Sequence, residues 1–383
     1  MLSLQALFWL SLWGLIYIYV GYPALVWICA CCRPHEPRRE QRTAPLSVVI
    51  AGHNEAHRLS EKLDSLFRSH RSDLIAEVLI GSDGSDDHTA EVIAVRNDQR
   101  LRLIAFTERR GKPAVLNDLV PQCRSDVVVL TDARQQLDPM ALVTLTAPFA
   151  DARVGVVSGE LMFLASDGAT AASEGIGAYW TYEKLIRKSE SRFRSVPGAT
   201  GALYAIRREL FRPVPDNTLL DDVVIPMQAV EQGYRCLLEP GAVAWDRPSQ
   251  SAGQESVRKR RTIAGCAQLI VNQPRWLLPW KNPIWWEFVS HKLARLASPA
   301  LLGVVLISNV LLAGRGRPVY SAMLAAQMGF YLCAWIGMLS QRSGGRTRSF
   351  GLPLMFLALN ATTVAALWDA ARGRFRATWQ RTS

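Results

Sequence analysis

An apolar segment near the amino terminus constrains the fold of this chain more than any other feature of its sequence. Residues 2–30 carry no charged side chain, and this run exceeds the roughly 20 residues that a helix needs to cross the hydrocarbon of a bilayer. The run is too long and too aromatic for a cleaved signal peptide. Residues 1–32 are therefore predicted to form a transmembrane anchor.

Three further apolar segments lie near the carboxyl terminus, at residues 297–313, 319–340 and 351–368. We predict three transmembrane segments within residues 297–368, followed by a basic tail over residues 369–383. Apolar residues make up 49% of the chain and charged residues 20%, which excludes a disordered protein. A mean hydropathy of +0.07 indicates that only part of the chain lies in lipid.

Positive charge gathers beside the first apolar segment. The formal net charge is +11, and a basic linker over residues 33–45 carries four arginines: Arg33, Arg38, Arg39 and Arg42. The positive-inside rule then predicts a multi-pass protein of the cell (inner) membrane, with the domain after the linker in the cytoplasm and the amino terminus outside. This placement also favours membrane lipids over nucleic acid as partners.

Four membrane-spanning segments conflict with the positive-inside rule at the carboxyl-terminal end of the chain. They place the carboxyl terminus outside, together with Arg315, Arg317 and the basic tail. Either the last segment, which has Asn360 at its middle, does not fully cross, or the tail is an exception. The sequence leaves both alternatives open.

Residues 274–296 are rich in aromatic and basic side chains. They include four tryptophans and a phenylalanine beside Lys281, Lys292 and Arg295. This composition predicts interfacial amphipathic helices in the plane of the lipid headgroups, and an ordinary amphipathic surface helix is the alternative.

Residues 46–273 alternate between short apolar runs and helical spacing. The runs near residues 46–50, 77–80, 102–106 and 126–130 read as strands with helices between them. This pattern predicts an α/β domain with a mostly parallel sheet, in which ligands bind beyond the carboxyl ends of the strands. Glu55, Asp83 and Asp132 are expected at those ends.

Acidic clusters at residues 81–87, 131–134 and 220–222 accompany Lys112 and a basic run at residues 258–261. Together they predict a site for a phosphorylated substrate. Carboxylates would hold a divalent cation, cations would take a leaving diphosphate, and one carboxylate would abstract a proton.

Each of these features also has a purely structural interpretation. Ser85, Asp86 and Asp87 could cap a helix at residues 89–95, and Asp222 could cap one at residues 223–232. Lys112 could be a solvated lysine at a helix start. The basic run could bind lipid headgroups, alone or in addition to a diphosphate.

The order of these motifs resembles that of the membrane-bound family 2 glycosyltransferases, relatives of the cellulose, chitin, hyaluronan and poly-N-acetylglucosamine synthases. The motifs lie at residues 52–55, 82–86, 111–117, 131–133, 200–202, 221–222 and 258–262. The resemblance implies a GT-A type of fold and a hexosyltransferase. It further implies a nucleotide sugar, expected to be UDP-linked, and a lipid or glycan acceptor.

The resemblance also implies roles for single residues. Glu55 and Asp83 match positions that line the base and ribose of the nucleotide. Asp132 matches the carboxylate that holds Mg²⁺ or Mn²⁺ against the diphosphate. Asp222 matches the general base that deprotonates the acceptor hydroxyl, and Asp221 stands where the family usually has Glu.

The cationic positions follow the same pattern, with two departures. Lys112, Arg258 and Arg261 are expected near the diphosphate. Arg134 stands where a second metal-binding Asp is usual, and its guanidinium could neutralise the diphosphate instead. Thr262 replaces an acceptor-stacking Trp, which makes transfer of a single sugar at least as plausible as processive extension.

These departures keep one alternative open, a catalytically degenerate membrane scaffold or regulatory protein with a glycosyltransferase fold. Other classes are disfavoured. No Gly-x-Gly-x-x-Gly motif of a dinucleotide-binding oxidoreductase follows the first strand, and the apolar segments lack the charges of a transporter. The seven cysteines show no metal-ligand spacing and read as reduced thiols, and no zinc site is expected.

Overall fold

The computed structural model describes residues 2–164, 171–247, 252–342 and 350–374. Its centre is a mixed sheet of eight strands in the order β3-β2-β1-β4-β7-β6-β8-β5. The strands are β1 (Leu46–Gly52), β2 (Ile75–Asp83), β3 (Leu101–Phe106), β4 (Val127–Asp132), β5 (Gln136–Leu137), β6 (Val154–Phe163), β7 (Leu203–Arg207) and β8 (Arg235–Asp246).

The predicted mostly parallel sheet is confirmed, with an antiparallel strand at its centre. β3, β2, β1 and β4 run parallel, and β8 runs parallel to β6. β7 lies antiparallel between β4 and β6, and β5 pairs antiparallel with β8 at the edge. β1, β2 and β4 are buried along nearly their whole length, which explains their continuous apolar runs.

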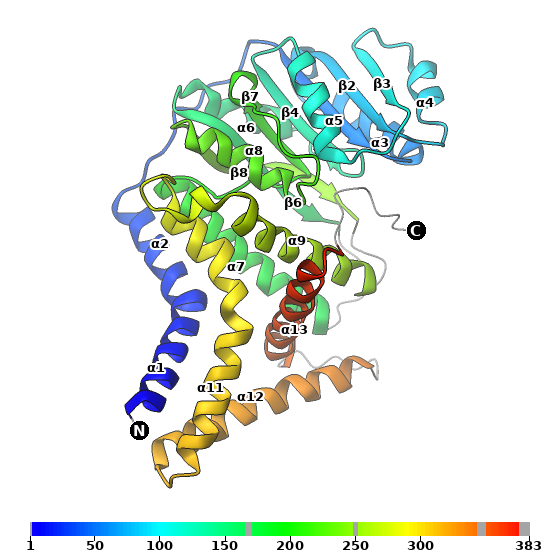
Figure 1. Cartoon of the computed structure of the whole chain (residues 1–383). Coiled ribbons are helices and arrows are strands. Elements are labelled where there is room, and N and C mark those ends of the chain that lie inside the picture. Colours follow the sequence, from blue (N-terminus) through cyan, green and yellow to red (C-terminus); the bar gives the residue numbers. More distant parts are fainter. Residues whose placement is uncertain (1, 165–170, 248–251, 343–349, 375–383) are drawn as a thin grey trace.

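Helices cover both faces of the sheet (Figure 1). Alternating strand residues form two cores, one under α3, α4 and α6 and the other under α5, α8 and α9. The helices of this domain are α3 (Ala56–Phe67), α4 (Thr89–Arg96), α5 (Lys112–Leu119), α6 (Ala141–Thr146), α7 (Ala171–Phe193), α8 (Asp221–Glu231) and α9 (Ala252–Asn272).

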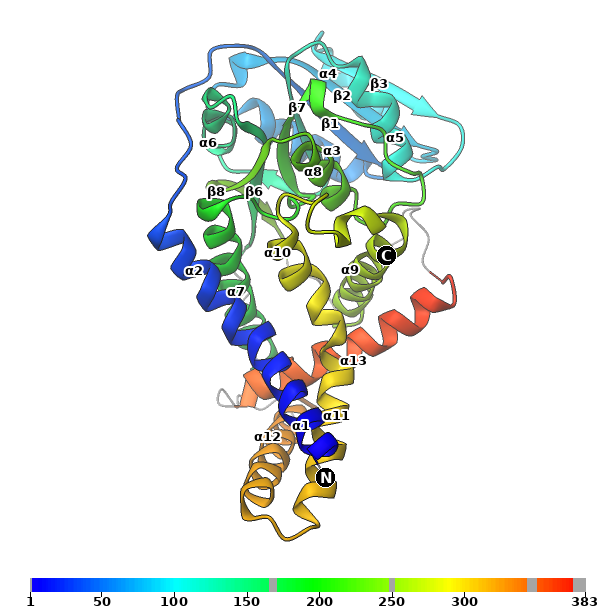
Figure 2. The ribbon, with the colours of Figure 1, turned by 60° about the vertical axis from the view of Figure 1, so that its left-hand side comes forward.

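Within the described part of the chain, four helices are long and apolar enough to cross a membrane, at Ser3–Cys32, Trp285–Ala313, Pro318–Ser340 and Gly351–Ala371. They extend away from the sheet on one side (Figure 2). Their elements are α1 (Leu2–Ile16), α2 (Tyr22–Cys32), α10 (Trp285–Glu287), α11 (Ser298–Ala313), α12 (Pro318–Arg342) and α13 (Gly351–Ala371). Most of the basic tail, residues 375–383, lies outside the described residues.

Residues 274–296 differ from the amphipathic helices expected there. They form a short 3-10 turn at Pro274–Leu277, and the helix that begins at Trp285 continues into α11. Trp276 and Phe288 are buried in the core beneath α8 and α9, whereas Trp280 is 73% exposed. The aromatic residues of this segment therefore serve mainly to join the sheet domain to the apolar helices.

Candidate active site

The carboxyl ends of β1, β2 and β4 meet at one edge of the sheet. The strand register pairs Gly52 with Ser82 on β2, and Ala51 with Asp132 on β4. Asp83 and Asp132 thus lie on either side of the end of β1, as the strand pattern predicts.

Asp83 holds the turn that leads into α5. This residue is fully buried, and its carboxylate accepts the backbone N–H groups of Arg110 at 2.8 Å and Gly111 at 2.7 Å. Gly111 has a φ of 96°, a left-handed conformation that favours glycine. Through this turn Asp83 positions Lys112, the first residue of α5. A contact between Asp83 and a nucleotide base stays a prediction.

Lys112 connects the carboxylates of two distant segments. Its Nζ lies 2.6 Å from Oδ1 of Asp132 and 3.6 Å from Oδ2 of Asp221. Burial alone lowers the pKa of Lys112, but the attraction of Asp132 and Asp221 outweighs it and the net shift is upward. Lys112 is therefore an ammonium ion held among acids and not a solvated surface lysine.

Asp222 lies at the start of α8, close to the same ammonium group. Its Oδ2 accepts the backbone N–H of Gly201 at 3.2 Å, and a Cβ added to Gly201 would lie 3.3 Å from that oxygen and 3.6 Å from Lys112 Nζ. Burial and the charge of Asp221 raise the pKa of Asp222 to about 6, although Lys112 opposes the shift. The N-cap position of α8 is Leu220, so the capping interpretation of Asp222 is wrong.

Arg134 turns toward the end of β8. Its guanidinium pairs with the buried carboxylate of Asp246 at 2.5 Å, and Gln135 donates to the same oxygen at 3.0 Å. The position that usually carries a second metal-binding Asp thus carries a cation that already has a carboxylate partner. Neutralisation of a diphosphate by Arg134 stays a prediction.

The loop after β1 is tied to the acidic cluster after β2. Asp87 accepts the backbone N–H groups of Ala56 at 2.9 Å and Thr89 at 3.2 Å, so it links the starts of α3 and α4, although the N-cap positions of these helices are Glu55 and His88. Glu55 lies within 3.2 Å of Arg58. Burial nevertheless raises the pKa of Glu55 above its usual range.

Arg258 and Arg261 of α9 lie on the same helix face as Gly265, whereas Arg260 pairs with Asp369 of α13. Gly265 contacts Leu220, the residue before Asp221, and Arg261 and Arg258 stand about one and two helical turns earlier on the same face. Their role at a diphosphate stays a prediction.

Two buried polar residues beneath the site were missed by the sequence analysis. Lys62 of α3 donates to Thr131 Oγ1 at 2.6 Å and to the carbonyl of Gln135 at 2.9 Å, and burial lowers its pKa to about 7. Burial, helped by the nearby carboxylates of Asp221 and Asp222, raises the pKa of Tyr204 well above its usual range. The position of Lys62 on the apolar stripe of α3 was a signal that could have revealed it.

A metal could be held here only together with a substrate. The described residues include no group of three or more His, Cys, Asp or Glu side chains that could bind a metal ion. Mg²⁺ commonly binds through one or two carboxylates plus substrate phosphates. Asp132 fits this mode, because its side chain is 30% exposed, and the buried Oδ2 of Asp221 has no hydrogen-bond partner in the described part of the chain.

Comparison with known proteins gives one family and several relatives. Residues 44–265 match the model of a family described as glycosyltransferase like family 2. The poly-beta-1,6-N-acetyl-D-glucosamine synthase of Staphylococcus aureus (strain COL) is 23% identical over 205 residues, which cover 52% of this chain and 49% of the relative. That of Staphylococcus epidermidis is 21% identical over 210 residues, covering 54% and 50%. The chain thus spans about half the length of these curated relatives.

One solved structure resembles nearly the whole chain. The mannosyltransferase PcManGT from Pyrobaculum calidifontis, in complex with GDP-Man and Mn²⁺, superposes with a TM-score of 0.71 and 21% identity. The match covers 97% of this chain and 100% of that chain. The predicted GT-A type of fold is confirmed by this likeness, which at such identity concerns the fold alone.

Proposed function

The chain belongs to glycosyltransferase family 2, and on that basis we propose that it transfers a hexose from a nucleotide sugar to a hydroxyl acceptor with inversion at the anomeric carbon. The acceptor is a lipid or a glycan at the membrane surface, and the product is a glycolipid or polysaccharide. The four apolar helices anchor the enzyme in the cell membrane, and the sheet domain works in the cytoplasm.

The observation that carries this proposal is the group of carboxylates around Lys112. Asp132, Asp221 and Asp222 come from β4 and α8, yet all three lie near one ammonium group. The pKa of Asp222 is raised to about 6, so its carboxylate is a stronger base than an ordinary aspartate and is still largely ionised at neutral pH. An ion pair with a purely structural role would need only one carboxylate beside Lys112, whereas three are present.

Asp222 acts as the general base in a single displacement. Its carboxylate takes the proton of the acceptor hydroxyl, and the oxygen forms a bond to the anomeric carbon. The bond between that carbon and the diphosphate oxygen breaks at the same time, and the nucleoside diphosphate leaves with the electron pair. Because attack occurs opposite the leaving group, the anomeric configuration inverts, and one base is sufficient.

Cations stabilise the departing diphosphate. Lys112 stands beside Asp132 at the carboxyl end of the sheet, and Arg258 and Arg261 would approach from α9. Mg²⁺ or Mn²⁺, when bound by Asp132 together with the donor, would neutralise charge on the diphosphate.

The expected donor nucleotide is UDP, and GDP is the competitor to test against it. The family resemblance favours UDP, whereas the structure with the similar fold contains GDP-Man. The absence of an aromatic residue at Thr262 supports transfer of a single sugar.

The test is turnover of a panel of UDP- and GDP-linked sugars by the full-length protein in membranes, read as released nucleoside diphosphate. Asp222→Asn is expected to abolish turnover and to retain nucleotide binding, because it removes the base and keeps the shape of the side chain. The exposed Asp216, six residues earlier, provides the matched control Asp216→Asn, which should stay within about twofold of the unmodified protein.

Turnover retained in Asp222→Asn would remove Asp222 as the base. Tight nucleotide binding without turnover of any donor by the unmodified protein would favour the catalytically degenerate scaffold. The pairing of Arg134 with Asp246, in place of a second metal-binding acid, is the feature that makes this comparison necessary.

A further inference from the structure

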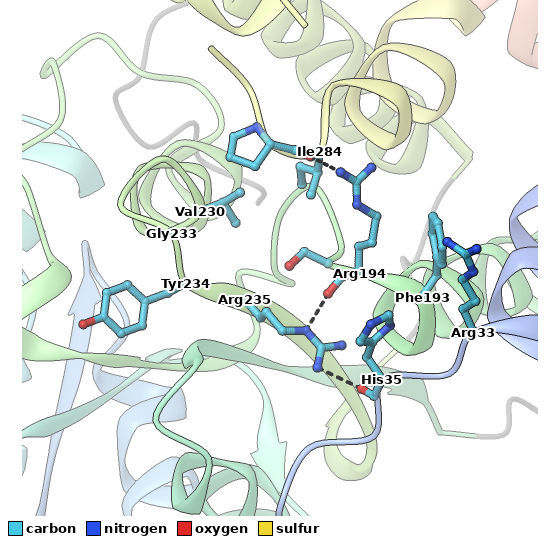
Figure 3. Close-up of a pocket in the computed structure, with 11 residues that line it drawn as sticks. Arg33, His35, Phe193, Arg194, Val230, Gly233, Tyr234, Arg235 and Ile284 are labelled. Atoms are coloured by element: carbon cyan, nitrogen blue, oxygen red, sulfur yellow. Dashed lines mark hydrogen bonds between the residues drawn. The ribbon is translucent and has the colours of Figure 1, made fainter. Parts of the chain in front are cut away.

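A cavity of about 500 Å³ lies where the amino-terminal helix meets the sheet domain. Figure 3 shows Arg33, Arg194 and Arg235 around it, with Phe193 and Ile284 among the apolar side chains of its wall. The described residues that line the cavity include no aspartate and no glutamate. It is a basic site with an apolar side, and it shares no residue with the carboxylates around Lys112.

The positive charge of this cavity is only partly compensated, by Glu36 and Asp151 near Arg235 and by Glu287 near Arg194. The guanidinium of Arg235 donates to the backbone carbonyls of Arg194 at 2.7 Å, His35 at 2.8 Å and Ser191 at 2.8 Å. These bonds hold the group in place but supply no negative charge. Within the described ranges the side chain of Arg33 has no hydrogen-bond or ion-pair partner.

Arg194 forms an ion pair with one carboxylate, that of Glu287. Its guanidinium donates to the carbonyl of Pro283 at 2.6 Å and lies 3.5 Å from the buried Glu287. Arg33 and Arg194 are exposed and Arg235 is half-buried, so these cationic side chains are accessible to an anion in the cavity.

We infer from the neighbouring apolar side chains that the cavity lies near the lipid headgroups. The apolar side chains of Leu25, Trp27 and Ile28 are about half exposed on α2, so contact with lipid continues almost to Arg33. Three residues before Pro283, which lines the cavity, Trp280 is 73% exposed and is followed by Lys281, a pairing typical of the interface between membrane and water.

We propose that this cavity binds the phosphate headgroup of an anionic phospholipid from the surrounding bilayer. Arginine guanidinium groups match the geometry of phosphate oxygens and can bind them through paired hydrogen bonds. The acyl chains extend along the exposed apolar side chains of α2. A zwitterionic headgroup is disfavoured, because its ammonium group would enter a site that already holds excess positive charge. This site does not depend on the proposed glycosyl transfer.

The test is native mass spectrometry of the full-length protein in mild detergent with equal amounts of phosphatidylglycerol and phosphatidylcholine. Retention of phosphatidylglycerol is expected to dominate, and Arg33→Gln is expected to weaken it roughly fivefold, the effect of one basic residue near an anionic membrane surface. The matched control is Arg38→Gln, which removes an equal charge from the same linker but outside the cavity, where Arg38 pairs with Glu40. This control should stay within about twofold.

Three results would overturn the proposal. Equal retention of the two lipids would remove the preference for an anionic headgroup. No loss in Arg33→Gln, or an equal loss in Arg38→Gln, would leave only general attraction to the surface. Saturable binding of inorganic phosphate to the lipid-free protein, abolished by Arg33→Gln, would assign the cavity to a free anion.

Discussion

At the residue scale, one ammonium group organises the candidate site. Lys112 stands within 2.6 Å of Asp132 and 3.6 Å of Asp221, with Asp222 beside them. Three carboxylates around one cation carry a net negative charge when all are ionised. Burial of the carboxylate and this negative charge, that of Asp221 above all, favour the protonated form of Asp222, and together they raise its pKa.

The activity should therefore fall on mild acidification. If Asp222 is the base, kcat/KM is expected to decrease as the pH drops through about 6. With a base of ordinary aspartate pKa, kcat/KM would stay constant down to about pH 4. The measurement is a pH profile of nucleoside diphosphate release between pH 4.5 and 8. A rate that stays constant down to pH 5 would contradict the assignment.

The same shift has a consequence for stability. The folded pKa of Asp222 lies above its usual value of 3.8, so its ionisation opposes folding as the pH rises from about 4 to 6. Asp222→Asn is then expected to raise the free energy of unfolding by roughly 1 to 3 kcal/mol above pH 6, and to have little effect near pH 4. Thermal unfolding at the two pH values measures this, and an equal effect at both would disprove it.

At the element scale, the approach of α9 to the start of α8 sets the position of the acids. A Cβ added to Gly265 would lie 2.5 Å from Leu220, and Gln268 of α9 accepts the backbone N–H of Leu219 at 2.9 Å. Both contacts are to residues directly before Asp221. The absence of a side chain at Gly265 is thus a condition for the present geometry.

Gly265→Ala is expected to displace α9 and the start of α8. Because catalysis depends on the placement of the base, the rate of glycosyl transfer should fall about tenfold or more, with the protein still folded. The control is Gly303→Ala on α11, where an added Cβ meets nothing within 4 Å. Equal kcat values for the two variants would show that α9 does not position the site.

At the scale of the whole molecule, a buried polar network joins the sheet domain to the apolar helices. His291 bridges Glu190 at 2.8 Å and Glu183 at 2.5 Å, and Arg295 contacts Glu183 at 2.8 Å. Tyr22 of α2 donates to Glu190 as well. Three segments far apart in the sequence, α2, α7 and residues 287–297, are connected in this way.

Glu183→Gln is expected to weaken this junction strongly. The change leaves Arg295 without its carboxylate partner in a largely buried place, which typically costs about 3 kcal/mol or more. The measurement is the thermal unfolding temperature in detergent, compared with the exposed control Glu91→Gln. A Tm equal to that of the control would indicate that the network contributes little.

The orientation of the molecule in the membrane is testable with single cysteines. On a background in which the exposed Cys31 and Cys32 are replaced by Ser, Lys281→Cys should resist a membrane-impermeant maleimide in intact cells, and Arg315→Cys should react. The opposite labelling pattern would place the sheet domain outside. Protection of both sites would show that α11 does not span the bilayer.

Much of the fold was predictable, because hydrophobic periodicity and the residue types at strand ends depend only on residues close together in the sequence. The apolar segments, the first four strands and the strand-end position of Asp132 follow from such patterns. The antiparallel strand β7 and the burial of Trp276 and Phe288 do not, since they depend on which distant segments pack together.

The sequence by itself determined the kind of molecule, a membrane-anchored α/β domain with acids at its strand ends, because hydrophobic length and spacing act over short stretches of chain. Only the tertiary structure decided that Lys112 joins Asp132 to Asp221, that Asp222 faces Gly201, and that Arg134 is engaged by Asp246. These partners are 20 to more than 100 residues apart. Their electrostatic effects arise only when folding brings them together and removes water from between them.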